Sequence, residues 1–213
     1  MSFITKVKND FTLISVLLIP VAVAINFVGF QLAQALKLPM YLDSIGTMLV
    51  GLIAGPWVGA ATGLLTNLIN GIFNPVYFAF IPIAILIGVL AGLFSKHKMM
   101  LGPIKIGICV VLMTLILTVA QAPIIVYVFG GATGTGSAAI TAAFLASGKQ
   151  IWESVFSSTI IAELSDKGIS LVTAFFIAKS MSSRYLSKFK YGEQYMKKNK
   201  KTKARKRQKN RKK

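Results

Sequence analysis

Six apolar runs, of which the second and third are short, constrain this chain more than any other feature of its sequence. A helix that crosses a bilayer needs about 20 mostly apolar residues, or fewer where it packs inside a bundle. The sequence predicts helices over residues 11–36, 42–55, 57–73, 77–95, 103–129 and 155–181. Only 14% of the residues are charged, against about 25% in ordinary soluble domains. We therefore expect an all-α integral membrane protein, a compact bundle of six transmembrane helices.

Basic residues in the connections predict how the bundle is oriented, because cytoplasmic loops of membrane proteins carry an excess of Lys and Arg. With six spans, three basic groups share one side: Lys6 and Lys8; Lys96, Lys98 and Lys105; and Lys179, Arg184, Lys188 and Lys190. If the second and third helices, joined by Gly55-Pro56, formed one span, the middle group would lie outside. We therefore expect two separate spans and both termini in the cytoplasm.

A cleaved signal peptide is the competing interpretation of residues 1–24. A basic start and an apolar run precede Ala22-Val23-Ala24, which superficially fits a cleavage site. The apolar sequence continues to Leu36, however, and five further spans follow. A retained first helix is the better interpretation.

The formal net charge of +18 comes largely from the end of the chain. Residues 197–213 hold 12 of the 24 Lys and Arg residues and no acidic residue, and a segment of this composition does not fold alone. We expect a membrane domain over residues 1–182 and a basic, largely disordered cytoplasmic tail over 183–213. The tail is expected to bind anionic lipid. Its charge would also attract nucleic acid, but we expect no dedicated nucleic-acid function.

The sequence lacks the residues that disulfides, zinc sites and nucleotide-binding motifs need. Cys109 is the only cysteine and His97 the only histidine, so neither a disulfide framework nor a zinc site is expected. Gly134, Gly136 and Ala139 match a GxGxxA pattern, but no strand precedes them, and the chain has no GK[ST] motif. We therefore expect no metal, no cofactor bound by this chain and no enzyme activity.

Polar residues inside the apolar helices are the candidate binding groups, because each must find a partner or face water. Most fall toward the predicted outer half: Asn26, Asp43, Asn67, Asn70, Asn74, Gln121, Glu163, Asp166 and Lys167. Such groups would suit a solute cavity open to the exterior. Glu163 and Lys167 are four residues apart and can pair. A self-neutralising cluster that holds the last helix to a neighbour explains these charges equally well.

The glycine-rich segment 130–137 predicts a flexible external lid of about 20 residues between the fifth and sixth helices. Trp152 and Glu153 follow it and are candidates to contact what it covers. Small residues also recur every four positions in two helices: Gly55, Gly59 and Gly63, followed at the same spacing by Asn67 and Gly71, in the third, and Ala84, Gly88 and Gly92 in the fourth. This spacing predicts close helix packing.

Three segments carry a resemblance to a known family: Pro39-Met40-Tyr41-Leu42-Asp43-Ser44-Ile45-Gly46-Thr47, Gly55-Pro56-Trp57-Val58-Gly59-Ala60 and Leu64-Leu65-Thr66-Asn67-Leu68-Ile69. Together with Glu163-Leu164-Ser165-Asp166-Lys167 in the last helix, they resemble the substrate-binding S components of energy-coupling factor (ECF) transporters. The resemblance covers roughly residues 10–182. It is specific for the family but not for one vitamin.

The resemblance implies a location in a bacterial cell membrane and a function. S components capture a vitamin or vitamin precursor outside the cell and dock on a membrane coupling subunit with two cytoplasmic ATPases, which use the ATP. In several members, two alanines four residues apart in the first helix form the docking face. The nearest equivalents here are Ala22 and Ala24, with Gly29 and Ala33.

Two other classes of function stay open at the level of sequence. A self-sufficient secondary transporter usually has inverted repeats or broken helices, and no convincing internal repeat is present. A membrane enzyme would have to use Glu163, Asp166 and Lys167, which form the only cluster with suitable groups.

Overall fold

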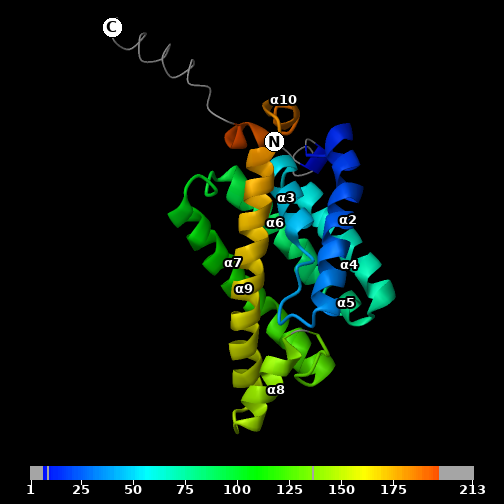
Figure 1. Cartoon of the computed structure of the whole chain (residues 1–213), viewed down its shortest axis with the longest axis vertical. Coiled ribbons are helices and arrows are strands. Elements are labelled where there is room, and N and C mark those ends of the chain that lie inside the picture. Colours follow the sequence, from blue (N-terminus) through cyan, green and yellow to red (C-terminus); the bar gives the residue numbers. More distant parts are fainter. Residues whose placement is uncertain (1–6, 9, 136, 197–213) are drawn as a thin grey trace, which may run out of the picture.

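Every helix that the sequence predicts is present in the protein. The computed structural model describes residues 7–8, 10–135 and 137–196, and this part of the chain is all-helical, without strands (Figure 1). Its elements are α2 (Leu13–Ala35), α3 (Ile45–Ala54), α4 (Pro56–Phe73), α5 (Val76–Ala79), α6 (Ile81–Lys96), α7 (Pro103–Phe129), α8 (Ala138–Ala146), α9 (Ile151–Ser180), α10 (Ser183–Leu186) and the 3-10 helix η1 (Gly192–Tyr195). Lys6, Gly136 and the basic segment 197–213 lie outside the described residues.

Proline and glycine set the helix boundaries. Gly55 has φ of +118°, a conformation that glycine adopts easily, and Pro56 occupies the first turn of α4, where its missing N–H costs nothing. The chain therefore turns sharply between α3 and α4, and the predicted division into two helices is confirmed. Gly102 and Pro103 begin α7 in the same way.

Helix α3 forms the centre of the bundle, because residues 46–54 are all buried and α2, α4, α6 and α9 pack around it. The predicted helix over 42–55 is too long. The helix begins only at Ile45, and ten residues rise about 15 Å, which is half the thickness of a bilayer core. Residues 36–44, which are not helical, therefore connect the end of α2 to the start of α3 inside the bundle (Figure 1).

The small residues of α4 and α6 bring these two helices into backbone contact, as their spacing predicts. A Cβ atom on Gly63 would lie 2.1 Å from the Ala84 carbonyl oxygen, and one on Gly88 would lie 2.2 Å from the backbone of Gly59. No side chain fits at these positions. The face of α4 that carries these glycines is thus packed against α6 of the same chain.

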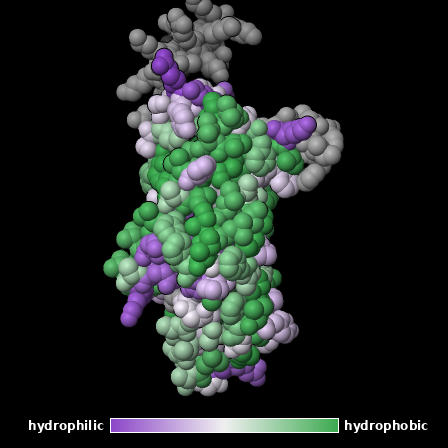
Figure 2. All heavy atoms as spheres, turned by 90° about the vertical axis from the view of Figure 1, so that its right-hand side faces the viewer, coloured by the Kyte–Doolittle hydropathy of each residue, from purple (hydrophilic) through white to green (hydrophobic). Residues whose placement is uncertain are grey.

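Apolar side chains cover much of the outside of the bundle. Helices α2 and α7 are long and apolar enough to cross a membrane. Large hydrophobic side chains on the outer faces of several helices are exposed, among them Leu17, Val21, Val28, Ile72, Ile104, Val119 and Phe176. Figure 2 shows hydrophobic side chains over most of one face. This surface is compatible with a helical membrane protein.

The segment after α9 folds onto the bundle, although the sequence predicted a largely disordered tail from residue 183. Leu186, Phe189 and Tyr195 are buried in the main core, and the Tyr191 N–H donates to the Ile53 carbonyl at 3.0 Å. These apolar and aromatic side chains separate residues 183–196 from the basic segment that follows. The packed helical part of the described chain thus extends to residue 196.

An ion pair joins the two ends of the described chain. The Lys190 Nζ lies 2.6 Å from the Asp10 Oδ1, and Asp10 is buried. Partial burial opposes the charged form of Lys190, but the hydrogen bond and the charge of Asp10 outweigh this effect and raise the Lys190 pKa. We call this end of the bundle, with the start of α7 and residues 183–196, the basic end.

Candidate functional site

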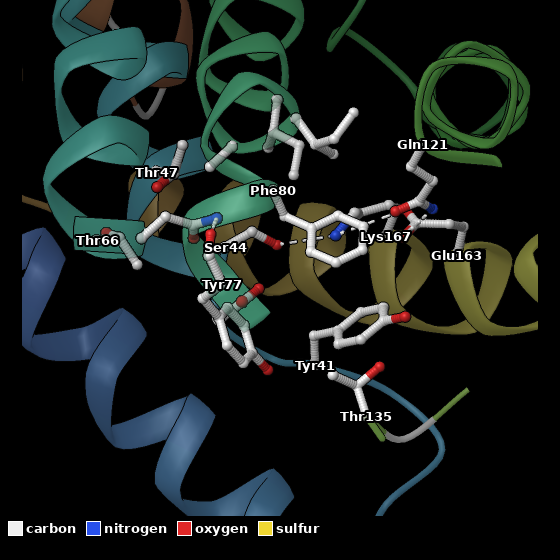
Figure 3. Close-up of a pocket in the computed structure, with 15 residues that line it drawn as sticks. Tyr41, Ser44, Thr47, Thr66, Tyr77, Phe80, Gln121, Thr135, Glu163 and Lys167 are labelled. Carbon is white, nitrogen blue, oxygen red and sulfur yellow. Dashed lines mark hydrogen bonds and ion pairs between the residues drawn. The ribbon is translucent and has the colours of Figure 1, made fainter. Parts of the chain in front are cut away.

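A pocket lies inside the bundle, toward the end formed by residues 36–44, 74–80 and 130–150, which we call the lid end (Figure 3). Its lining combines aromatic, apolar, polar and charged side chains: Tyr41, Asp43, Ser44, Thr47, Thr66, Asn67, Tyr77, Phe80, Ile83, Ala84, Ile87, Gln121, Thr135, Glu163 and Lys167. These residues come from α3, α4, α5, α6, α7, α9 and the connections between them. The pocket thus draws on nearly every helix of the bundle.

The pocket is narrow. The space between its walls, including the part open to solvent, is about 540 Å³, of which about 50 Å³ is wide enough for the centre of a water molecule. That room suits a few waters, whereas sites for drug-sized ligands measure about 300–1,000 Å³. The walls therefore have to part before a solute of that size can enter.

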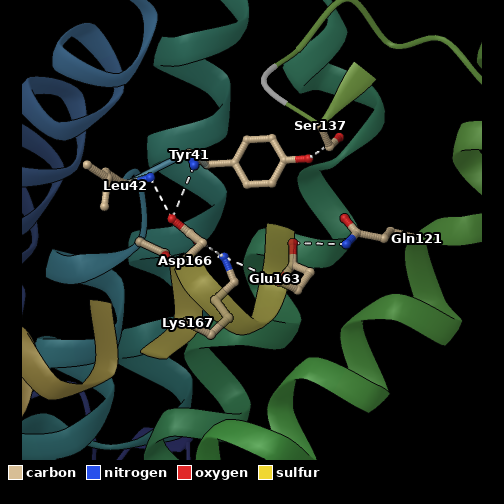
Figure 4. A network of polar contacts seen from close by, with 8 residues as sticks. Tyr41, Leu42, Gln121, Ser137, Glu163, Asp166 and Lys167 are labelled. Carbon is tan, nitrogen blue, oxygen red and sulfur yellow. Dashed lines mark hydrogen bonds and ion pairs between the residues drawn. The ribbon is translucent and has the colours of Figure 1, made fainter. Parts of the chain in front are cut away.

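A buried ion cluster forms one wall. The Lys167 Nζ lies 2.5 Å from the Asp166 Oδ2 and 3.6 Å from the Glu163 Oε2, and all three side chains are at most 2% exposed. The same ammonium donates to the Ser44 Oγ at 3.4 Å. Its hydrogen-bonding capacity is therefore directed at groups of the protein itself (Figure 4).

Asp166 holds the non-helical segment before α3 in place. Its Oδ1 accepts hydrogen bonds from the backbone N–H groups of Tyr41, at 3.2 Å, and Leu42, at 2.7 Å. Backbone outside a helix needs such partners when it lies inside a bundle. Asp166 does not line the pocket, so its role is to position the Tyr41–Leu42 backbone and Lys167.

Glu163 has one oxygen satisfied and one available. Its Oε1 accepts a hydrogen bond of 2.9 Å from the Gln121 Nε2. Its Oε2 is buried and accepts no hydrogen bond from the described residues, with the Lys167 ammonium 3.6 Å away. A buried carboxylate oxygen without a hydrogen bond is costly, which makes it a candidate contact for a solute.

Thr135 and Ser137 lie over the pocket at the lid end. Thr135 lines the pocket, and the hydroxyl groups of Tyr41 and Ser137 are 2.8 Å apart and share a hydrogen bond. The sequence predicted a flexible lid here, but the connection also contains α8, which is tied to α9 by the Thr141–Ser158 hydrogen bond of 2.7 Å. Of this connection, the glycine-rich part rather than α8 contributes to the pocket, through Thr135.

Five of the predicted binding residues meet in the pocket: Asp43, Asn67, Gln121, Glu163 and Lys167. They come from four separate segments of the chain. The structure thus brings together residues that the sequence could only place on the same half of the bundle.

The remaining predicted residues lie elsewhere. Trp152 is 37% exposed and packs against Tyr127 and Phe156, while Glu153 forms an exposed ion pair of 2.6 Å with Lys149. The α9 helix begins at Ile151 and points this turn away from the pocket. Neither residue contacts the space under the lid.

Three asparagines are also absent from the pocket lining. Asn74 ends α4, where its Oδ1 accepts from the Val76 N–H at 3.2 Å. Asn70 is fully buried, and neither of its side-chain polar atoms has a partner in the described part of the chain. Asn26 joins three helices, as described next.

Asn26 is a structural residue. Its Nδ2 donates to the hydroxyls of Thr47 and Thr66, both at 2.8 Å, and its Oδ1 accepts from the Gly46 N–H at 2.6 Å. Every hydrogen bond links α2 to α3 or α4. The side chain thereby fixes two threonines that line the pocket.

We expect Asn26→Ala to lower the free energy of unfolding by about 1–3 kcal/mol, because it leaves the buried Gly46 N–H without its acceptor. Asn74→Ala, at the half-buried end of α4, is the matched control and should change stability by less. Thermal unfolding in detergent measures both. Equal stability of the two variants would contradict this structural role for Asn26.

The predicted docking residues do not form one outer face. Ala22, Gly29 and Ala33 are buried inside this chain, and a Cβ atom on Gly29 would lie within 1.9 Å of the Leu42 carbonyl oxygen. Only Ala24 is exposed. The small residues of α2 therefore serve packing against residues 42–46 rather than contact with a partner.

The sequence analysis did not select several of the lining residues, namely Tyr41, Ser44, Thr47, Thr66, Tyr77, Phe80 and Thr135. Tyr41 and Ser44 flank Asp43 in the sequence, and Thr66 precedes Asn67, so adjacency offered a signal for these three. No local pattern marks Tyr77 or Phe80, because aromatic residues are common in any apolar connection.

Comparisons with known proteins give this chain no relative. No family model, no curated protein and no solved structure matches it. The described residues also contain no group of three or more His, Cys, Asp or Glu side chains placed to hold a metal ion. The function must therefore be argued from the pocket.

Proposed function

We propose that this chain is the substrate-binding S component of an ECF-type importer. It would bind a vitamin or vitamin precursor in the pocket from outside the cell. It would then deliver the solute by docking on a membrane coupling subunit with two ATPases. This proposal includes six membrane-spanning helices and both termini in the cytoplasm.

The observation that carries the proposal is the narrow pocket with buried charges beneath the lid end. Its ion cluster is at most 2% exposed, and residues from two connections, Tyr41 and Thr135, line it. A concave site lined by apolar and aromatic side chains with a few convergent polar groups is the usual form of a small-molecule binding site. Burying charged side chains inside an apolar bundle costs free energy, and simple packing does not require them. Their presence therefore favours a binding role.

The distribution of basic residues supports the orientation. Figure 1 shows the chain start, the end of α9 and α10 at the same end of the bundle. Eight basic residues belong to these segments or to the α6–α7 connection and its flanks: Lys8, Lys96, Lys98, Lys105, Lys179, Arg184, Lys188 and Lys190. Lys37 and Lys149 lie at the lid end. The excess of basic residues on cytoplasmic loops would therefore place the lid end, with the pocket beneath it, outside the cell.

Uptake measurements test the proposal. The solute that co-purifies with the chain would be identified by mass spectrometry and offered, labelled, to vesicles that contain the chain alone or with an ECF module. We expect binding by the chain alone, and uptake only with the module and ATP inside. Uptake by the chain alone would contradict the proposal and indicate a self-sufficient transporter.

The basic segment offers a control in the same assay. A chain truncated after Met196 keeps every described residue of the pocket and of the packed 183–196 segment. Its binding of the solute should equal that of the full chain.

A further inference from the structure

We propose that the pocket selects a planar aromatic solute that carries a positive charge or several N–H donors, such as an amidine or an aminoheterocycle. This inference rests on the proposed function, since it names the class of solute that the same site would bind. It follows from three properties of the pocket: its charge, its free hydrogen-bonding groups and its aromatic walls.

Acidic side chains outnumber basic ones at the site. Asp43, Glu163 and Lys167 line the pocket and Asp166 lies beside Lys167, so three carboxyl groups accompany one ammonium. Lys167 is closest to Asp166, at 2.5 Å. Asp43 and Glu163 both line the pocket, and Asp43 forms no ion pair with any described residue. A cationic solute would supply the missing positive charge, whereas an anionic solute would add to the repulsion.

One buried acceptor in the pocket wall is left without a hydrogen bond. Lys167 donates to Asp166 and Ser44, Gln121 donates to Glu163, and Asn67 donates to the Tyr77 carbonyl at 3.2 Å. The Glu163 Oε2 is buried, lies in the pocket wall and accepts no hydrogen bond from the described chain. A solute with N–H donors would satisfy this oxygen, and such charge-assisted hydrogen bonds are the strong ones.

Aromatic rings supply the remaining walls. Tyr41, Tyr77 and Phe80 line the pocket (Figure 3). Two of the rings are braced from behind: Phe80 stacks on Phe129, with centroids 5.8 Å apart, and Tyr77 meets Phe30 edge-on at 4.9 Å. Braced rings favour a flat solute, and their faces attract a positive charge.

Three isosteric probes test the inference with the full chain in detergent: benzamidinium, benzamide and benzoate, which are cationic, neutral and anionic. We expect benzamidinium to bind about tenfold more tightly than either of the others, a difference of about 1.4 kcal/mol. Isothermal calorimetry or the ligand-dependent shift in unfolding temperature gives the three affinities.

Two charge-removing variants locate the selectivity. Glu163→Gln should abolish the preference for benzamidinium, because it removes the charge but keeps the shape of the side chain. Glu153→Gln is the matched control, since its carboxylate is exposed and paired with Lys149 outside the pocket, and it should keep the preference. If Glu163→Gln fails to fold, Asp43→Asn makes the same test from the other carboxylate.

Equal affinity for all three probes, no measurable binding of any, or tighter binding of benzoate would overturn the inference. A co-purifying solute that is anionic would overturn it as well, while uptake that depends on the ECF module would still support the proposed function. Selective benzamidinium binding without module-dependent uptake would support the inference about the solute but contradict the proposed function.

Discussion

Replacing Lys167 with methionine is expected to lower the free energy of unfolding by about 3–5 kcal/mol, the usual cost of removing one partner from a buried ion pair. The change leaves Asp166 and Glu163 buried without the ammonium that lies 2.5 Å and 3.6 Å from them. Methionine fills a similar volume, so the loss reports the charge rather than a cavity. Thermal or denaturant unfolding of the purified variant in detergent measures it.

Lys149→Met is the matched control, because it also breaks a lysine–carboxylate pair with a spacing of four residues. Lys149 lies just before α9, and its partner Glu153 lies in the first turn of α9. The side chains of Lys149 and Glu153 are 37% and 57% exposed, and such pairs contribute about 0–1 kcal/mol. In the double variant Asp166→Asn, Lys167→Met, part of the lost stability should return, because the nearest carboxylate no longer carries a charge. Equal stability of Lys167→Met and Lys149→Met would refute the buried ion cluster.

Gly88→Ala is expected to destabilise the bundle by about 1–3 kcal/mol or more, the cost of forcing atoms into a packed core. The added methyl group would lie 2.2 Å from the Gly59 backbone, where no side chain can move aside. Helices α4 and α6 would have to separate, and both contribute residues to the pocket. We therefore expect a lower unfolding temperature together with weaker solute binding.

Gly107→Ala makes the same chemical change on α7, where nothing lies within 4 Å of the new Cβ atom. Alanine has the higher helix propensity, so this variant should be equal to the native protein or more stable by up to about 1 kcal/mol. The two substitutions thus have opposite expected signs. A stable Gly88→Ala variant would mean that α4 and α6 do not meet through their backbones.

The helices were predictable because their signals are local. Apolar runs of helical length, the Gly55-Pro56 turn and Pro103 at the start of α7 fix where the helices begin and end. The face shared by Gly59 and Gly63 identified a packing surface for the same reason. The glycine pattern did not tell which helix would fill that surface, and the structure assigns it to α6.

Some buried polar residues hold helices together and others line the pocket, and the sequence could not indicate which residue does which. Asn26 and Asn67 are both asparagines in apolar helices, yet Asn26 bonds to α3 and α4, whereas Asn67 lines the pocket. The partner of a buried polar group is decided by the neighbouring helix. Residues 20 to 40 positions away in the chain supply the bonds of Asn26, so no local pattern contains them.

The sequence by itself determined that this chain forms apolar helices, with basic residues concentrated at one end, because both follow from the composition of continuous segments. Tertiary structure alone decided which side chains form the pocket, that Asp166 holds the Tyr41–Leu42 backbone, and that residues 183–196 close the basic end. It also buried Ala22 and Gly29, which the sequence placed on a docking face. The physical reason is that a side chain's environment depends on which helix packs against it, and that choice is made by long-range contacts.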